Sequence, residues 1–162
     1  MIAQSLLPEL QNEFPNTRKM LERVPAASFD WKPHEKSMTL IRLATHLATL
    51  PQWLTMTVNT TELDFSKSPY SPPKFETTQE IVDAFDKNVQ EALDALKGAS
   101  DEALMQPWTL RNGEQIFFTM PRIAVIRSLV ISHMIHHRAQ LQVFLRLLNV
   151  PVPGMYGPSA DE

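Results

Sequence analysis

Cysteine is absent from this chain of 162 residues, and glycine is scarce. Without a thiol, the chain cannot use a catalytic cysteine, a disulfide or a cysteine-ligated zinc or iron–sulfur centre. Only 4 glycines stand against 13 prolines, and neither the G-x-G-x-x-G nor the G-x-x-x-x-G-K-[ST] pattern occurs. We therefore expect no glycine-rich loop that cradles nucleotide phosphates.

Strong charge and long apolar runs are missing as well. The formal net charge is −3, which gives no electrostatic case for a nucleic-acid partner. The N-terminal stretch has no basic residue before Glu9, unlike a secretory signal. The most apolar run, residues 123–135, contains Arg127 and His133 and is too short to cross a bilayer. We expect no membrane partner and a cytoplasmic location.

The composition that remains is typical of a globular protein. Hydrophobic residues make up 43% of the chain and charged residues 20%, and a chain of this length can bury a sizeable core without covalent staples. The length predicts one domain over residues 1–162.

Apolar periodicity predicts four long helices, of which the first two contain prolines. The first spans about residues 2–24, and Pro15 should kink or interrupt it because proline lacks the N–H of the helical ladder. The second begins near Ser37 or Thr39, and Pro51 predicts a kink within it. Its apolar stripe consists of Leu40, Leu43, Leu47, Leu50 and Leu54.

The third helix has sequence signals at both ends. Residues 60–76, rich in Ser, Thr and Pro, are typical of a loop. Thr77 and Glu80 then form a capping box that starts the third helix, and Gly98 is expected just past its end. Ser100 is a candidate cap for a short turn.

The segment before the fourth helix is less regular. Asn112 and Gly113 lie between two apolar segments and predict a hairpin. Pro121 suits the first position of the fourth helix, which should run to about Leu148. The fold class is therefore all-α: a four-helix bundle, with a small hairpin or irregular insert between helices three and four. The connections are too long to choose between up-down order and a topology with crossovers.

Histidines supply the main chemical signal. His133 and His137 lie one turn apart on the fourth helix, a spacing by which a helix presents two imidazoles to one metal. Apolar neighbours at helical offsets turn this pair inward, and those around His46 do the same on the second helix. His46, His133 and His137 are thus a candidate metal site, although an inward histidine is more often a hydrogen-bonded core residue.

The other two histidines have simpler interpretations. His34 lies in the loop before the second helix, where it is either exposed or packed on Trp31. His136 points about a quarter turn away from His137, which favours a structural or supporting role. Gln140 and Gln142 are near enough in sequence to support the histidines, but the sequence does not place them. The three tryptophans are candidates for the core or a pocket wall: Trp31, Trp53 and Trp108.

Charge separates the last two helices. Residues 76–102 hold eight acidic residues and two lysines, whereas the fourth helix region carries four arginines and no acid. The simplest interpretation is that the two helices are neighbours with complementary faces. A functional interpretation places Arg138 near the metal as the ligand of an anionic substrate group.

With this histidine pattern, the chain resembles the DinB-like (DinB/YfiT) superfamily. The resemblance spans nearly the whole chain and rests on the order of four segments: W-K-P at 31–33, S-M-T-L-I-R-L-A-T-H-L at 37–47, H-M-I-H-H-R-A-Q-L at 133–141 and N-V-P-V-P-G-M-Y-G-P-S at 149–159. One departure is that family members often have glycine where Arg42 or Leu43 stands.

The resemblance implies a four-helix bundle with one divalent metal on three histidines, at positions that match His46, His133 and His137. Characterised members include transferases and isomerases that use low-molecular-weight thiols, and homodimers are common. The resemblance thus implies a metal-dependent thiol transferase, a small-molecule substrate and a homodimer.

The residues themselves leave the chemistry open. Three imidazoles with open positions are typical of a catalytic metal site and suit zinc, nickel, iron or copper. Such a metal either binds a thiol as thiolate or activates water for hydrolysis. The alternatives are a metal-dependent hydrolase, a non-catalytic stress-associated metal-binding bundle, and a helical dimerisation module without metal. No general acid or base can be named.

Overall fold

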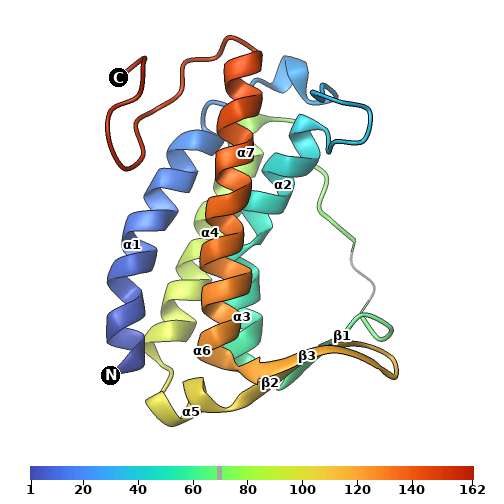
Figure 1. Cartoon of the computed structure of the whole chain (residues 1–162), viewed down its shortest axis with the longest axis vertical. Helices are drawn as coiled ribbons and strands as arrows, with labels where there is room; N and C mark the ends of the chain where they lie inside the picture. Colours follow the sequence, from blue (N-terminus) through green and yellow to red (C-terminus); the bar gives the residue numbers. More distant parts are fainter. Residues whose placement is uncertain (69–70) are drawn as a thin grey trace.

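Four helical segments run along the length of the molecule in the computed structural model, which describes residues 1–68 and 71–162 (Figure 1). The predicted bundle is confirmed, and two of its four segments are broken into consecutive helices. The segments are α1 (Ile2–Leu21); α2 (Leu40–Thr49) with α3 (Pro51–Asn59); α4 (Thr78–Lys97); and α6 (Arg122–Val125) with the π-helix η2 (Ile126–Ser132) and α7 (His133–Leu147).

The helix order, which the sequence left open, is up-down-down-up with crossovers. In Figure 1, α1 and α7 run upward, whereas α2–α3 and α4 run downward. Two parallel neighbours, α3 and α4, therefore need a long return connection, which is the segment after Asn59. Residues 72–76 of this connection lie beside α2.

Proline and caps set the helix ends largely as predicted. The first helix is an exception: the predicted interruption at Pro15 does not occur, and α1 continues through this residue to Leu21, three residues short of the predicted end. The second segment is divided at Pro51, which supplies no N–H at the start of α3. The capping box of α4 forms, but Gly98 has a right-handed backbone (φ −81°), so the position does not use the left-handed freedom of glycine.

A small sheet lies at one end of the bundle. The predicted hairpin forms from β2 (Pro107–Asn112) and β3 (Gln115–Pro121), and Gly113 turns the chain with a φ of +56°. The structure adds β1 (Glu62–Asp64), which pairs in parallel with β2. This strand lies inside the segment predicted as loop; with three residues it is too short to give a period-two signal. The short helices η1 (Ala26–Ser28) and α5 (Asp101–Met105) complete the fold.

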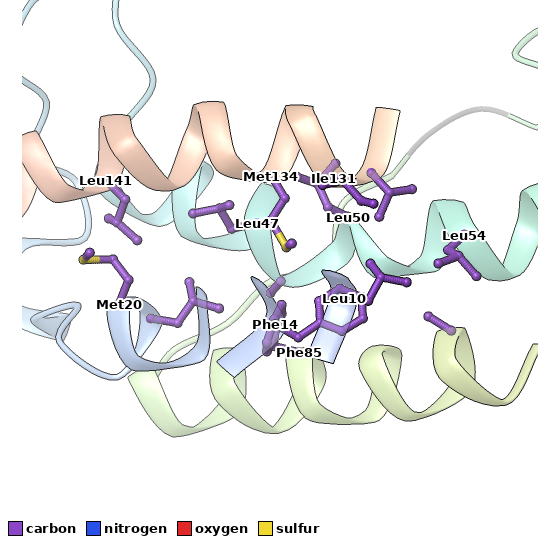
Figure 2. Close-up of a cluster of buried hydrophobic side chains, with 14 of the residues drawn as sticks. Leu10, Phe14, Met20, Leu47, Leu50, Leu54, Phe85, Ile131, Met134 and Leu141 are labelled. Carbon is purple, nitrogen blue, oxygen red and sulfur yellow. The ribbon is translucent and has the colours of Figure 1, made fainter. Parts of the chain in front are cut away.

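The apolar core is continuous along the bundle. Figure 2 shows side chains of α1, α2, α3, α4 and α7 meeting in one layer, including Phe14 and Phe85, whose ring centroids are 6.1 Å apart. Trp108 of β2 is fully buried, and its indole N–H donates to Thr60 Oγ1. No described helix is long and apolar enough to cross a membrane.

The predicted charge pairing of the third and fourth helices is wrong. The arginines of the α6–α7 segment bind α1 and the C-terminal tail: Arg127 pairs with Glu9, and Arg146 pairs with Asp161. On α4, Asp86 pairs with α1 through Arg18. α1 lies between α4 and α7 on this side of the bundle, so it takes ion pairs from both.

Candidate metal centre

The three predicted histidines meet between α2 and α7. These two helices pack side by side (Figure 1). His46 lies in the last turn of α2, and His133 is the first residue of α7. The wider π-helical turn η2 ends directly before His133, and such segments are frequent at functional sites. His137 is buried, whereas His46 and His133 are half-buried, so the cluster lies at the rim of the core and is open on one side.

The geometry brings three ring nitrogens to one point. The Nε2 atoms of His46 and His133 are 3.3 Å apart, and those of His133 and His137 are 2.8 Å apart. Each of the three residues offers a nitrogen within 4.8 Å of the others. Two nitrogens that share one ion at about 2.0–2.1 Å can lie at most about 4.2 Å apart, and both Nε2 separations are inside that limit.

The outer nitrogens of two rings are held by other groups. His137 Nδ1 donates to Gln140 Oε1 at 2.7 Å, and Gln140 in turn donates to His136 Nε2 at 3.1 Å. The His133 ring is hydrogen-bonded to the Leu129 backbone. With these outer nitrogens acting as donors, the Nε2 atoms of both rings present lone pairs to the cluster.

Burial keeps all three rings neutral. It is the main cause that lowers the pKa of His46 to about 4, and the charges that His137, His133 and Arg42 can carry add to the effect. Burial also lowers the pKa of His133 and of His137, although the Gln140 contact partly opposes this at His137. Neutral imidazole is the form that ligates a metal, so the donors are ready at neutral pH.

The donor set fits a divalent transition metal. Nitrogens bound to tetrahedral zinc at about 2.0–2.1 Å lie roughly 3.3 Å from one another. The His46–His133 separation matches this value, and the His133–His137 separation is about half an ångström shorter. At 2.8 Å, His133 Nε2 and His137 Nε2 lie at hydrogen-bond distance, and a metal ion bound by both would replace the proton between them.

Arg138 is held on the other side of α7, away from the histidines. Its guanidinium donates to Glu13 Oε2 at 2.6 Å and to Thr17 Oγ1 at 3.1 Å, and it also binds the hydroxyl of Tyr156. Its side chain is 3% exposed. The predicted anion-binding role thus gains no support from the geometry, because the guanidinium already fixes α7 to α1 and the tail.

A cavity of about 750 Å³ adjoins His46 on the outer face of α2. Its walls come from α2 and from residues 72–76 of the return connection. Arg42 lines it one turn before His46 and is one of the two positions, with Leu43, where members of the resembled family often have glycine. The i,i+4 spacing of Arg42 and His46 could have indicated this neighbour, but the cavity itself depends on the path of a distant loop.

The remaining predicted residues lie outside the cluster. His34 is exposed, and its Nδ1 accepts from the Lys36 N–H, which supports the exposed interpretation. Trp31 packs edge-on against Phe144, with ring centroids 5.6 Å apart. His136 is exposed and contacts the cluster through Gln140.

Comparison with known proteins identifies the family and agrees with the helical fold. The model of the DinB family matches residues 2–162. The chain belongs to the DinB family. It is 27% identical over 146 residues to the uncharacterized protein YrdA of Bacillus subtilis (strain 168), covering 90% of this chain and 83% of that one.

Two solved structures are similar to this DinB family member. A DinB-like protein from Bacillus cereus ATCC 10987 is 26% identical and superposes with a TM-score of 0.72, covering 94% of this chain and 97% of that one. The DinB-like protein YjoA from Bacillus subtilis is 16% identical, with a TM-score of 0.70 and 90% and 94% coverage, and it supports the fold alone.

Proposed function

We propose that this DinB family protein is a metal-dependent transferase that acts with a low-molecular-weight thiol. The single observation that carries the proposal is the convergence of the His46, His133 and His137 Nε2 atoms at an open rim beside a cavity. Three neutral nitrogens leave positions for exchangeable ligands, as in catalytic rather than structural metal sites. A divalent ion held there, such as zinc, nickel or iron, would favour the thiolate form of a thiol at neutral pH.

The residues of this chain would position the reactants. Gln140 fixes the His137 ring through Nδ1, so that Nε2 stays directed at the cluster. The cavity beside His46 offers room for a second substrate. In the transfer, the thiol sulfur forms a bond to an electrophilic carbon, the leaving group departs with its electron pair, and the thiol proton passes to solvent.

Metal content tests the first half of the proposal. Untagged wild-type protein should contain close to one divalent ion per chain by mass spectrometry of the metals. His133→Ala should lose it, whereas His34→Ala, which removes an exposed histidine outside the cluster, should keep it. Equal metal content in His133→Ala and wild type would refute the site.

Turnover tests the second half. Metal-loaded protein is incubated with a panel of small thiols and electrophiles, and the thioether products are identified by mass spectrometry. Thiol-dependent product that disappears in His133→Ala supports the transferase. Product formed with water in place of thiol would indicate a hydrolase, and a loaded protein without turnover would indicate a non-catalytic metal-binding bundle. We also infer a homodimer, which a monomer mass in light scattering at all concentrations would refute.

A further inference from the structure

The cavity beside His46 has a chemical character that the histidines do not explain. Met38, Ile41 and Phe75 form apolar walls, and all three pack against the hydrophobic core. Because they are anchored there, the cavity is preformed, and its volume of about 750 Å³ is in the range of small-molecule sites. The cavity therefore fits a ligand with an apolar body.

Charged residues that line the cavity indicate the second feature of the ligand, its charge. Arg42 and Lys74 line the cavity together with one acid, Glu76, so that cationic groups exceed anionic groups by one. Across the described ranges, neither Arg42 nor Lys74 forms an ion pair with a carboxylate. The excess of one positive charge favours a monoanion over a dianion such as a phosphate monoester.

Arg42 places this positive charge next to the histidine cluster. It lies one turn before His46 on α2, so the two side chains share a face with Cβ atoms about 5–6 Å apart. Arginine is exposed here and its planar fork can bind a carboxylate through two parallel hydrogen bonds. A ligand held at Arg42 would extend along the apolar wall next to the histidine cluster.

We propose that this cavity binds a small organic acid with an apolar body, whose carboxylate is held by Arg42. The inference names the class of the second substrate in the proposed thiol transfer and rests on that function for its chemistry. Binding of the acid rests on the cavity alone. The acid-binding proposal and the thiol-transfer proposal can therefore fail separately.

The test uses 4-phenylbutyrate and its neutral amide as probes, titrated calorimetrically into full-length His133→Ala protein. This metal-impaired background prevents a carboxylate from binding through an ion at the histidines. The parent should bind the acid roughly tenfold or more tightly than the amide. Arg42→Gln should weaken the acid roughly ten- to a hundredfold and leave the amide unchanged, and Arg42→Lys should fall between.

Two further variants locate the site. Arg127→Gln makes the same charge change at an exposed arginine paired with Glu9, and it should bind both probes like the parent. Ile41→Trp, which fills the cavity, should weaken both probes together. Circular dichroism checks that each variant is folded.

The proposal is overturned if the parent does not bind the acid, or binds acid and amide equally. It is also overturned if Arg127→Gln weakens the acid as much as Arg42→Gln, or if folded Ile41→Trp binds both probes unchanged. Acid binding without thiol turnover would refute only the transferase, and thiol turnover without acid binding would refute only this inference.

Discussion

Two adjacent residues of α7, His137 and Arg138, face opposite environments. His137 turns toward α2 and joins a cluster of neutral nitrogens that is open on one side. Arg138 turns toward α1 and is enclosed with Glu13, Thr17 and Tyr156. Consecutive helix residues point about 100° apart, so adjacency in sequence does not make two residues partners in one site.

The two sides of α7 also differ in how their polar groups find partners. On the α1 side, the charges of Arg138 and Glu13 are matched within the protein, which suits a fixed helix contact. On the α2 side, the Nε2 atoms of His133 and His137 are 2.8 Å apart and have no charged partner of their own among the described contacts, which suits a shared external ligand. The side of α7 that carries Arg138, here called the closed face, therefore has its polar groups matched within the protein. The side that carries His133 and His137, here called the open face, has ring nitrogens that could hold a metal ion.

Breaking the closed face should have the largest effect. Arg138→Ala leaves the Glu13 carboxylate buried without its partner, and we expect a loss of about 3–5 kcal/mol in the free energy of unfolding. Urea denaturation measures it. Replacing both partners, in Glu13→Leu with Arg138→Met, should restore much of that stability because no buried charge remains. A folded Arg138→Ala protein with wild-type stability would show that the pair is not structural.

Breaking the open face should leave the metal-free protein folded and remove its response to metal. If zinc binds at the cluster, a concentration 100 times Kd should stabilise wild-type protein by about 2.7 kcal/mol. His137→Ala should gain almost nothing from the same addition. Thermal or urea unfolding with and without zinc measures the difference. A full response in His137→Ala would place the metal elsewhere.

Lowering the pH should weaken the open face and spare the closed one. Burial lowers the pKa of His46 from 6.5 to about 4, so the unfolded chain binds more protons between these values. The stability of metal-free protein should therefore fall as pH drops from about 6.5 toward 4, by about 2 kcal/mol for this residue. His46→Gln should flatten the curve. An equal slope in the variant would show that His46 is not the group responsible.

Much of this architecture could be predicted because it depends on local patterns. The 3.6-residue periodicity gave the helices, the capping box gave the start of α4, and the four-residue spacing of His133 and His137 gave two members of the cluster. His46 could be added because its apolar neighbours showed which face of α2 is inward.

What could not be predicted depends on long-range packing. The direction of Arg138 required knowing that α1 lies beside α7. The place of Arg42 in a cavity wall required knowing where residues 72–76 pass. The parallel pairing of β1 joins segments more than forty residues apart. The π-helix η2 changes the helical winding before His133, and its sequence contains no proline or glycine that would predict the change.

The smallest effect should come from loosening the support of the open face. Gln140→Met removes the acceptor of the His137 Nδ1 proton, so the ring is no longer fixed with Nε2 toward the cluster. Metal affinity should fall by about tenfold, or roughly 1.4 kcal/mol, with one site per chain retained. Competition with a chromophoric chelator measures this affinity.

The matched control is Gln142→Met, which makes the same change two residues further along α7, where the side chain lines a different hollow formed by the C-terminal tail. It should leave metal affinity unchanged. If both variants weaken the metal equally, the loss reflects a general change in α7. If neither variant weakens the metal, packing alone orients His137, and the Gln140–His137 hydrogen bond adds nothing to metal affinity. A loss confined to Gln140→Met would show that the hydrogen bond from Gln140, within α7, orients the His137 ring for the metal.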